Sequence, residues 1–304
     1  MTNPLPKVDA LIIGIGAAGG IASYVLTQAG IDVVALEAGP RRDKTDFLAY
    51  YDELQAYPYH NPFADVKANK EIPTWRPNAQ SPVQAPPVGP IVMDNQVGGT
   101  SVHWTGQAWR YREDDFKIRT TTIDKYGEDA LPEGTNIVDW PVTYDELESY
   151  YEKVEQLVGI SGESGSNPFE SPRKSDYPLP PLRQSGYMDM ASDGLKQSGY
   201  HPFPGPAGII SQDFDGRPAC SYCGYCTGHG CWNDAKSSTL VSAIPKAEKT
   251  GKLEIRTLCR VMKILSNDQG QLTGVQYLDA DGVLQEQPAG VVILSTYVYE
   301  NSRL

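Results

Sequence analysis

The sequence predicts an α/β fold whose first unit is a strand, a helix and a second strand of a parallel sheet. Val8–Ile13 is a short apolar run that ends at a glycine, as buried parallel strands often do. Residues 19–29 have helical character and stop at Gly30, and residues 31–36 form a second apolar run. Together these segments make a βαβ unit of about 30 residues.

A glycine pattern joins the first strand to the helix and predicts a Rossmann-type dinucleotide site. The first glycine of G-x-G-x-x-G permits a sharp turn, the second lets the backbone approach a pyrophosphate, and the third lets the helix pack against the strand. The helix N-terminus then offers free N–H groups to the phosphates. The candidate residues are Gly14, Gly16, Ala17, Ala18 and Gly19.

Glu37 ends the second predicted strand, 18 residues after Gly19. A carboxylate at this place can accept hydrogen bonds from both ribose hydroxyls of a dinucleotide. The alternative, a solvated carboxylate at a strand end, does not explain the spacing. The motif alone does not separate FAD from NAD. The N-terminal position of the unit and the run Glu37-Ala38-Gly39, which resembles the Glu-x-Gly ending of many flavoproteins, favour FAD.

A second glycine motif, about 80 residues later, carries a family resemblance. It reads Gly98-Gly99-Thr100-Ser101-Val102-His103-Trp104. Paired glycines followed by hydroxyl side chains provide backbone N–H groups and short donors for phosphates. With the first motif, it resembles the glucose–methanol–choline (GMC) oxidoreductases, in the branch of bacterial sugar and sugar-acid dehydrogenases such as the gluconate 2-dehydrogenases.

The resemblance implies a discontinuous domain organisation. An FAD-binding domain like those of the GMC enzymes and p-hydroxybenzoate hydroxylase would comprise residues 1–115 and 233–304. Residues 116–232 would form an insert on the substrate side, partly irregular, with one helix, loops and a cysteine cluster. The C-terminal half of the family's fold would be missing from this chain.

The resemblance also assigns roles to single residues. Gly98, Gly99 and Ser101 would lie along the flavin and its phosphates. His103 matches the histidine that holds the flavin covalently through its 8α-methyl group in some members; the alternatives are a histidine that only contacts the ring or that fills the core. The backbone of Val261 would meet the adenine.

Four cysteines lie within twelve residues, at Cys220, Cys223, Cys226 and Cys231. This spacing is close to a ferredoxin run, although the last gap is longer and no proline follows. An iron–sulfur cluster is the leading interpretation, because some dehydrogenases of the family carry one in the corresponding region and electrons must leave a flavin singly for a cytochrome or quinone. Zinc, free thiols and disulfides remain open. His229, inside the run, is interpreted as a loop residue.

The expected reaction is oxidation of a C–OH group of a sugar, sugar acid or alcohol, with hydride passing to flavin and electrons to an external acceptor. In the family, a histidine in the last quarter of a longer chain is the base. The sequence has only His60, His103, His201 and His229, so no catalytic residue is assigned. The competing interpretations are a cofactor-binding or electron-transfer fragment that is inactive without a second polypeptide, and an NAD-dependent reductase, against which the second glycine motif speaks.

Charge and hydropathy limit the expected partners. The net charge of −12 argues against nucleic acid. We also expect no membrane span and see no signal peptide. The resemblance implies a small-molecule substrate, and as partner subunits a cytochrome c and a small Tat-exported protein. The compartment stays open between cytoplasm and a periplasmic or membrane-associated location reached through partners.

Five further elements are predicted from periodicity. Thr143 and Glu146 form a capping box that starts a helix over residues 143–158, with an apolar stripe at Leu147, Tyr150, Tyr151, Val154 and Val158. A second helix is expected at residues 237–249. Strands are expected at residues 253–264, 274–278 and 291–294, and their turns suggest a small antiparallel ribbon. Residues 50–90 and 161–186 are expected to be irregular.

Overall fold

The structure is a computed structural model that describes residues 5–47, 76–83 and 94–304. The chain divides into two compact units, Met1–Thr105 with Ser221–Leu304, and Gly106–Cys220. Most of the expected irregular region at residues 50–90, and His60 with it, lies outside the described residues.

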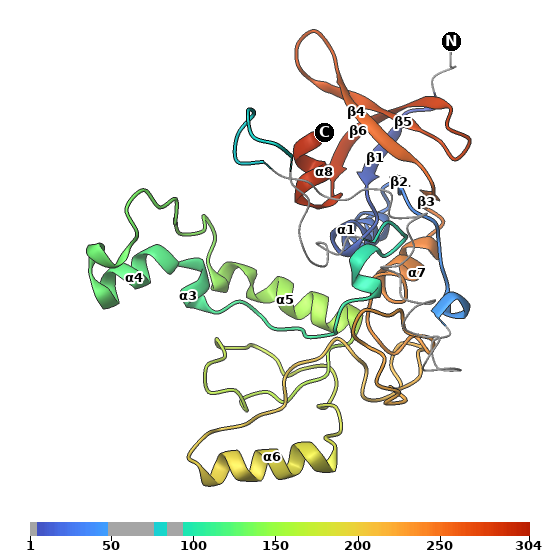
Figure 1. The fold of residues 1–304 in the computed structure, drawn as a ribbon. Helices are drawn as coiled ribbons and strands as arrows, with labels where there is room; N and C mark the ends of the chain where they lie inside the picture. The colour runs from blue at the N-terminus through green and yellow to red at the C-terminus, as the bar shows by residue number, and fades with distance from the viewer. Residues whose placement is uncertain (1–4, 48–75, 84–93) are drawn as a thin grey trace. The chain divides into compact units, whose positions relative to one another are not determined.

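The first unit is built on a mixed sheet of six strands in the order β3-β2-β1-β6-β5-β4 (Figure 1). Strands β3, β2, β1 and β6 pair in parallel, whereas β6, β5 and β4 pair antiparallel. This confirms the α/β prediction, the parallel βαβ unit and the antiparallel ribbon. The strands are β1 (Val8–Ile13), β2 (Val33–Leu36), β3 (Leu253–Arg256), β4 (Arg260–Ser266), β5 (Leu272–Leu278) and β6 (Leu284–Leu294).

Strand β6 joins the two halves of the sheet. Its first residues pair with β5, and its last residues pair with β1, where Val291 lies opposite Ala10 and Leu294 lies opposite Ile13. The predicted strand at residues 291–294 is therefore the end of a longer strand. Because β1 is held between two parallel neighbours, the turn that follows it has a fixed position at the carboxyl edge of the sheet.

The prediction of one strand over residues 253–264 was wrong. The chain breaks between β3 and β4 at Leu258, which has a φ of 56°. There the amides of Leu258 and Cys259 donate to the carbonyls of Gly39 and Glu37, at 3.1 and 2.8 Å. These bonds turn the chain across the end of β2, a tertiary contact that apolar patterning does not reveal.

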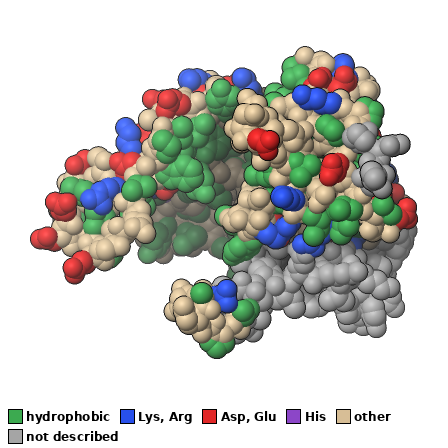
Figure 2. Space-filling model, turned by 90° about the horizontal axis from the view of Figure 1, so that it is seen from above, with side chains coloured by type: hydrophobic (Ala, Val, Ile, Leu, Met, Phe, Trp, Pro, Cys, Tyr) green, Lys and Arg blue, Asp and Glu red, His purple; other side chains and the backbone are tan. Residues whose placement is uncertain are grey.

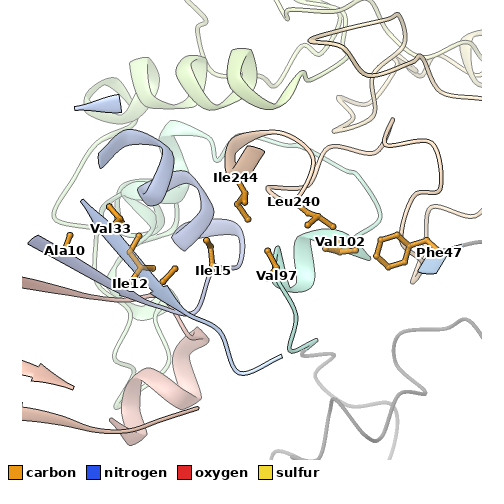
Figure 3. Close-up of a cluster of buried hydrophobic side chains, with 10 residues drawn as sticks. Ala10, Ile12, Ile15, Val33, Phe47, Val97, Val102, Leu240 and Ile244 are labelled. Carbon is orange, nitrogen blue, oxygen red and sulfur yellow. The ribbon is translucent and has the colours of Figure 1, made fainter. Parts of the chain in front are cut away.

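A cluster of buried side chains joins the sheet to the helices on one of its faces (Figure 3). It runs from Ile12 on β1 through Ile15 and Val97 to Leu240 and Ile244. Helices α1 (Ala17–Gln28) and α7 (Ala243–Glu248) lie side by side over it (Figure 1). A second cluster, which includes Leu11, Val34 and Val275, is separate from the first. The unit also contains η1 (Lys44–Phe47), η4 (Gly99–Val102) and α8 (Tyr297–Arg303).

Helix α7 is shorter than the predicted helix at residues 237–249. The preceding residues 236–239 are all buried and hydrogen-bond to other segments through side chains or backbone. Those contacts favour an irregular path over a helix.

In the second unit, α5 (Tyr144–Val158) has the predicted capping box. Thr143 accepts a hydrogen bond from the Glu146 amide, and the Glu146 carboxylate accepts one from the Thr143 amide at 2.7 Å. Helix α6 (Gly186–Gln197) follows the expected loop. The remaining helices are α3 (Glu113–Phe116), α4 (Ile118–Tyr126) and η5 (Glu128–Ala130).

The predicted apolar stripe of α5 was only partly right. Tyr150 is 60% exposed and Val154 is 39% exposed, whereas Glu148 and Glu155 are buried. The two carboxylates are buried because arginines meet them. Arg110 bonds to both, and Arg173 bonds to Glu155. Helical periodicity locates a face but does not show that acids on it have buried cationic partners.

The surface carries both signs of charge. On the face seen in Figure 2, lysine and arginine side chains lie among aspartate, glutamate and hydrophobic ones. Within the described part of the chain, no helix is long and apolar enough to cross a membrane.

Candidate functional site

The first glycine motif forms the turn that the sequence predicts. Gly14 has a φ of +82°, a left-handed conformation, and a Cβ there would approach the carbonyl of Ser295 to 2.9 Å. A Cβ on Gly19 would overlap the carbonyl of Gly14, so only glycine lets α1 pack this closely. No side chain caps the N-terminus of α1, which leaves its first N–H groups available to an anion.

The second glycine motif lies directly against the first. A Cβ on Gly99 would come within 2.9 Å of the Cα of Gly16, and the amide of Gly98 donates to the Ile15 carbonyl at 2.9 Å. Gly98 and Gly99 both have positive φ values, 91° and 52°. Two segments about 80 residues apart in sequence therefore form one glycine-lined wall.

Thr239 holds this wall together, and sequence reasoning missed its role. Its hydroxyl donates to the carbonyl of Gly16 at 3.1 Å, and its amide donates to the hydroxyl of Ser101 at 3.3 Å. A Cβ on Gly20 would meet the Thr239 side chain. Its only signal in the sequence is the polar run at residues 236–239, which no periodicity places beside a glycine motif.

Glu37 is 6% exposed at the end of β2. Its carboxylate accepts hydrogen bonds from the amides of Ile15 at 3.1 Å and Gly39 at 2.9 Å. Burial raises its pKa from 4.5 to about 7; those amides oppose the shift and Asp94 adds to it. The two hydrogen bonds thus fix the carboxyl group beside the glycine turn.

These residues line a pocket of about 510 Å³. The pocket brings together predicted residues from both glycine motifs with Glu37 and Val261. It is also lined by residues that the sequence analysis did not assign to the site, among them Asn95, Thr100 and Arg260. The volume and the mixture of backbone N–H groups, a carboxyl group and apolar walls fit part of a dinucleotide. The predicted residues that line it are Gly14, Gly16, Ala17, Ala18, Glu37, Gly99 and Val261.

Gly19, Gly98, Ser101 and His103 lie outside the lining of this pocket. Gly19 and Gly98 shape the wall through packing, and Ser101 bonds to the carbonyl of Gly98 at 2.6 Å. His103 follows η4 and is 6% exposed. Burial lowers its pKa to about 4, and the nearby charge of Lys236 acts in the same direction, so the imidazole is neutral at neutral pH.

The four predicted metal ligands fall on both sides of the boundary between the two units. Cys220 is the last residue of the second unit, whereas Cys223, Cys226 and Cys231 belong to the first. Cys223 is exposed, and Cys220, Cys226 and Cys231 are partly buried. Among the residues that the structure describes, no group of three or more His, Cys, Asp or Glu side chains is arranged to hold a metal ion.

Comparison with known proteins finds one matching family model and several relatives of similar sequence. A family model described as GMC oxidoreductase matches residues 182–303. The gluconate 2-dehydrogenase flavoprotein of Pantoea cypripedii is 32% identical over 326 residues, covering 100% of this chain and 53% of that protein. The fructose dehydrogenase large subunit of Gluconobacter japonicus is 26% identical, covering 100% of this chain and 55% of that protein.

Among solved structures, a formate oxidase from Aspergillus oryzae superposes with a TM-score of 0.56 at 13% identity, covering 99% of this chain and 47% of the oxidase. This similarity shows a shared fold. The chain spans about half the length of the curated relatives it matches. Over that half, the sequence similarity and the shared fold lead to one conclusion: the chain belongs to the GMC oxidoreductase family.

Proposed function

We propose that this chain is the FAD-binding part of a dehydrogenase that oxidises a C–OH group of a sugar, sugar acid or alcohol. The observation that carries the proposal is the pocket in which two distant glycine motifs meet Glu37. The relatives named as gluconate and fructose dehydrogenases support this substrate class.

In this proposal each part of the pocket has a task. The N-terminus of α1 and Gly16 hold the pyrophosphate, Glu37 accepts from the ribose hydroxyls, and Val261 faces the adenine. Gly98, Gly99 and Ser101 support the rest of the cofactor. When bound, FAD would supply the acceptor for a hydride from the substrate carbon. The protein's contribution here is binding and orientation.

Glu37→Ala tests the cofactor site. Removing a charged hydrogen-bond acceptor should cost about 2 kcal/mol or more of FAD binding, which equals a roughly thirtyfold higher Kd. Glu254→Ala is the matched control, because Glu254 lies on the neighbouring strand with its side chain 58% exposed. Titration of FAD-free protein by flavin fluorescence measures both. Equal affinities for parent, Glu37→Ala and a Gly16→Val variant would refute the assignment.

We also propose that His103 contacts the isoalloxazine ring, with a covalent bond as the stronger form of the hypothesis. A neutral imidazole next to the second glycine motif is compatible with both forms. Acid precipitation separates them: flavin that stays with the unfolded parent and is lost in His103→Ala indicates a bond. Complete release from the parent rules out the bond but leaves the contact.

The iron–sulfur relay stays a prediction from the spacing of Cys220, Cys223, Cys226 and Cys231. Among the described residues, no three His, Cys, Asp or Glu side chains are arranged to hold a metal ion, so metal binding would have to reorganise the cysteine loop. Iron and sulfide in anaerobically prepared protein, with a paramagnetic signal in one oxidation state, would support it. Zinc alone, or a mapped disulfide between two of the four cysteines, would reject it.

The second candidate function is a cofactor-binding module that needs further polypeptide to act. The chain's coverage of about half of each relative favours it, as does a pocket whose lining contains no histidine. In that case a second segment or subunit supplies the base. A cytochrome c subunit and a small exported subunit remain proposed partners.

A further inference from the structure

Lys236 is a buried lysine outside the pocket and is 2% exposed. Its ammonium donates to the backbone carbonyls of Trp104 at 2.8 Å, Cys226 at 2.6 Å and His229 at 2.5 Å. An ammonium has three N–H groups, so all of its donors are used by neutral peptide oxygens from two different segments.

The surroundings offer this cation little compensation. None of the ion pairs formed by the described residues includes Lys236, and the three acceptors of its ammonium are all neutral carbonyls. A buried ammonium is costly to keep, and an apolar side chain would fill the same space at less cost. Its three hydrogen bonds offset that cost and show what the side chain does here: it joins two segments of the chain.

The contacts of Lys236 show which segments it joins. One acceptor is Trp104, which follows His103; the other two belong to the cysteine loop, residues 226–231. Two neighbouring bonds reinforce the connection: the Gly228 amide donates to the His103 carbonyl at 3.1 Å, and the Trp104 indole donates to the Ser237 carbonyl at 3.1 Å. The peptides after His103 and after Trp104 are thus both held.

We propose that Lys236 is a positioning residue of the flavin site, which fixes the His103–Trp104 backbone against the cysteine loop and places a positive charge beside His103. The inference rests on the proposed function, in which His103 contacts the flavin. It adds that the flavin's surroundings and the cysteine loop are coupled through one ammonium.

The test compares the 304-residue chain, loaded with FAD, with its Lys236→Met variant. Lys249→Met is the control, because Lys249 is an exposed lysine in the same unit. One readout is the flavin itself, by midpoint potential and visible circular dichroism. The other is hydrogen–deuterium exchange of the peptide covering residues 221–235. This second readout applies whatever the cysteines hold.

In Lys236→Met, the potential should become more negative, because loss of a positive charge disfavours the extra negative charge of reduced flavin. The visible dichroism should change, and the loop should exchange about tenfold faster or more, as expected for losing a hydrogen bond to a charged donor. Lys236→Arg should recover the potential through its charge. It should recover loop protection only partly, because a planar guanidinium cannot direct three donors to one point as an ammonium does.

Lys249→Met should change neither readout. Faster loop exchange in Lys236→Met with an unchanged potential and dichroism would overturn the proposal, because Lys236 would then only anchor a loop. If Lys236→Met does not fold, Lys236→Arg decides: parent-like loop protection, or an altered potential, would contradict the inference. A parent that binds no FAD would refute the proposed function instead.

Discussion

At the scale of single residues, Glu37 makes the candidate site sensitive to pH. Its pKa is about 7 in the folded protein against an ordinary 4.5, chiefly because of burial. A raised pKa means that the folded state prefers the protonated carboxyl group. The stability contributed by this group is therefore fully present below pH 4.5 and is lost as the pH rises through 7.

We predict that FAD-free protein loses roughly 3 kcal/mol of unfolding free energy from this group over that range. In Glu37→Gln, the unfolding free energy should not show this decrease with rising pH, because an amide does not titrate. Urea unfolding at a series of pH values measures it, with Glu254→Gln as the control. Parallel pH profiles for parent and Glu37→Gln would contradict the burial argument.

Two glycine-to-alanine substitutions should change the stability of the protein in opposite directions. A Cβ on Gly39 would overlap the Asn95 carbonyl, beside the pocket, whereas a Cβ on Gly194 in α6 meets nothing within 4 Å. Gly39→Ala should therefore destabilise the protein by about 2 kcal/mol or more, because backbone must move. Gly194→Ala should stabilise it by about 0.5–1 kcal/mol through helix propensity. Thermal unfolding of both variants checks the two signs, and a neutral Gly39→Ala would disprove the close approach.

At the scale of elements, α5 is held by buried charge as well as by apolar contacts. Glu155 accepts from Arg110 at 2.7 Å and from Arg173 at 2.5 Å, and all three side chains are less than 10% exposed. The nearby guanidinium of Arg173 also lies 3.7 Å over the ring of Tyr177. Glu155 is thus the carboxylate that the two buried cations share.

Glu155→Gln should cost about 1–3 kcal/mol, because it leaves each buried guanidinium with a single carboxylate, Glu148 for Arg110 and Glu170 for Arg173. Glu152→Gln, on the same helix with a partly exposed side chain, should change stability by less than about 0.5 kcal/mol. Chemical denaturation measures both. Similar, small effects would mean that water reaches the ion cluster and that α5 depends on its apolar contacts instead.

At the scale of the whole molecule, the chain spans about half the length of its relatives, and no histidine is among the described residues that line its pocket. We predict that the 304-residue chain by itself oxidises gluconate, glucose or other polyols at a rate near background. Acid–base catalysis commonly contributes about 10²–10⁴-fold, and in the proposed function a second segment or subunit supplies the base. Dye-linked assays of the FAD-loaded chain check this. Robust turnover would show that a histidine of this chain acts as the base.

Much of the fold was predictable because its signals are local. The strand–glycine–helix order at residues 8–28, the capping box at Thr143 and the antiparallel ribbon all follow from neighbouring residues. The glycine requirements at Gly14 and Gly19 follow from a single turn. The break at Leu258 and the irregular residues 236–242 were not predictable, because their geometry is set by bonds to segments far away in the sequence.

The sequence by itself determined the α/β class, the glycine turn with its acidic residue at the next strand end, and the resemblance to a flavoenzyme family. Only the tertiary structure brought Gly16 against Gly99, placed Thr239 between them and gave Lys236 its three carbonyls. The physical reason is range: backbone propensity and periodicity act over a few residues, whereas the glycine-lined wall and the buried ammonium depend on packing between segments about 80 to 220 residues apart.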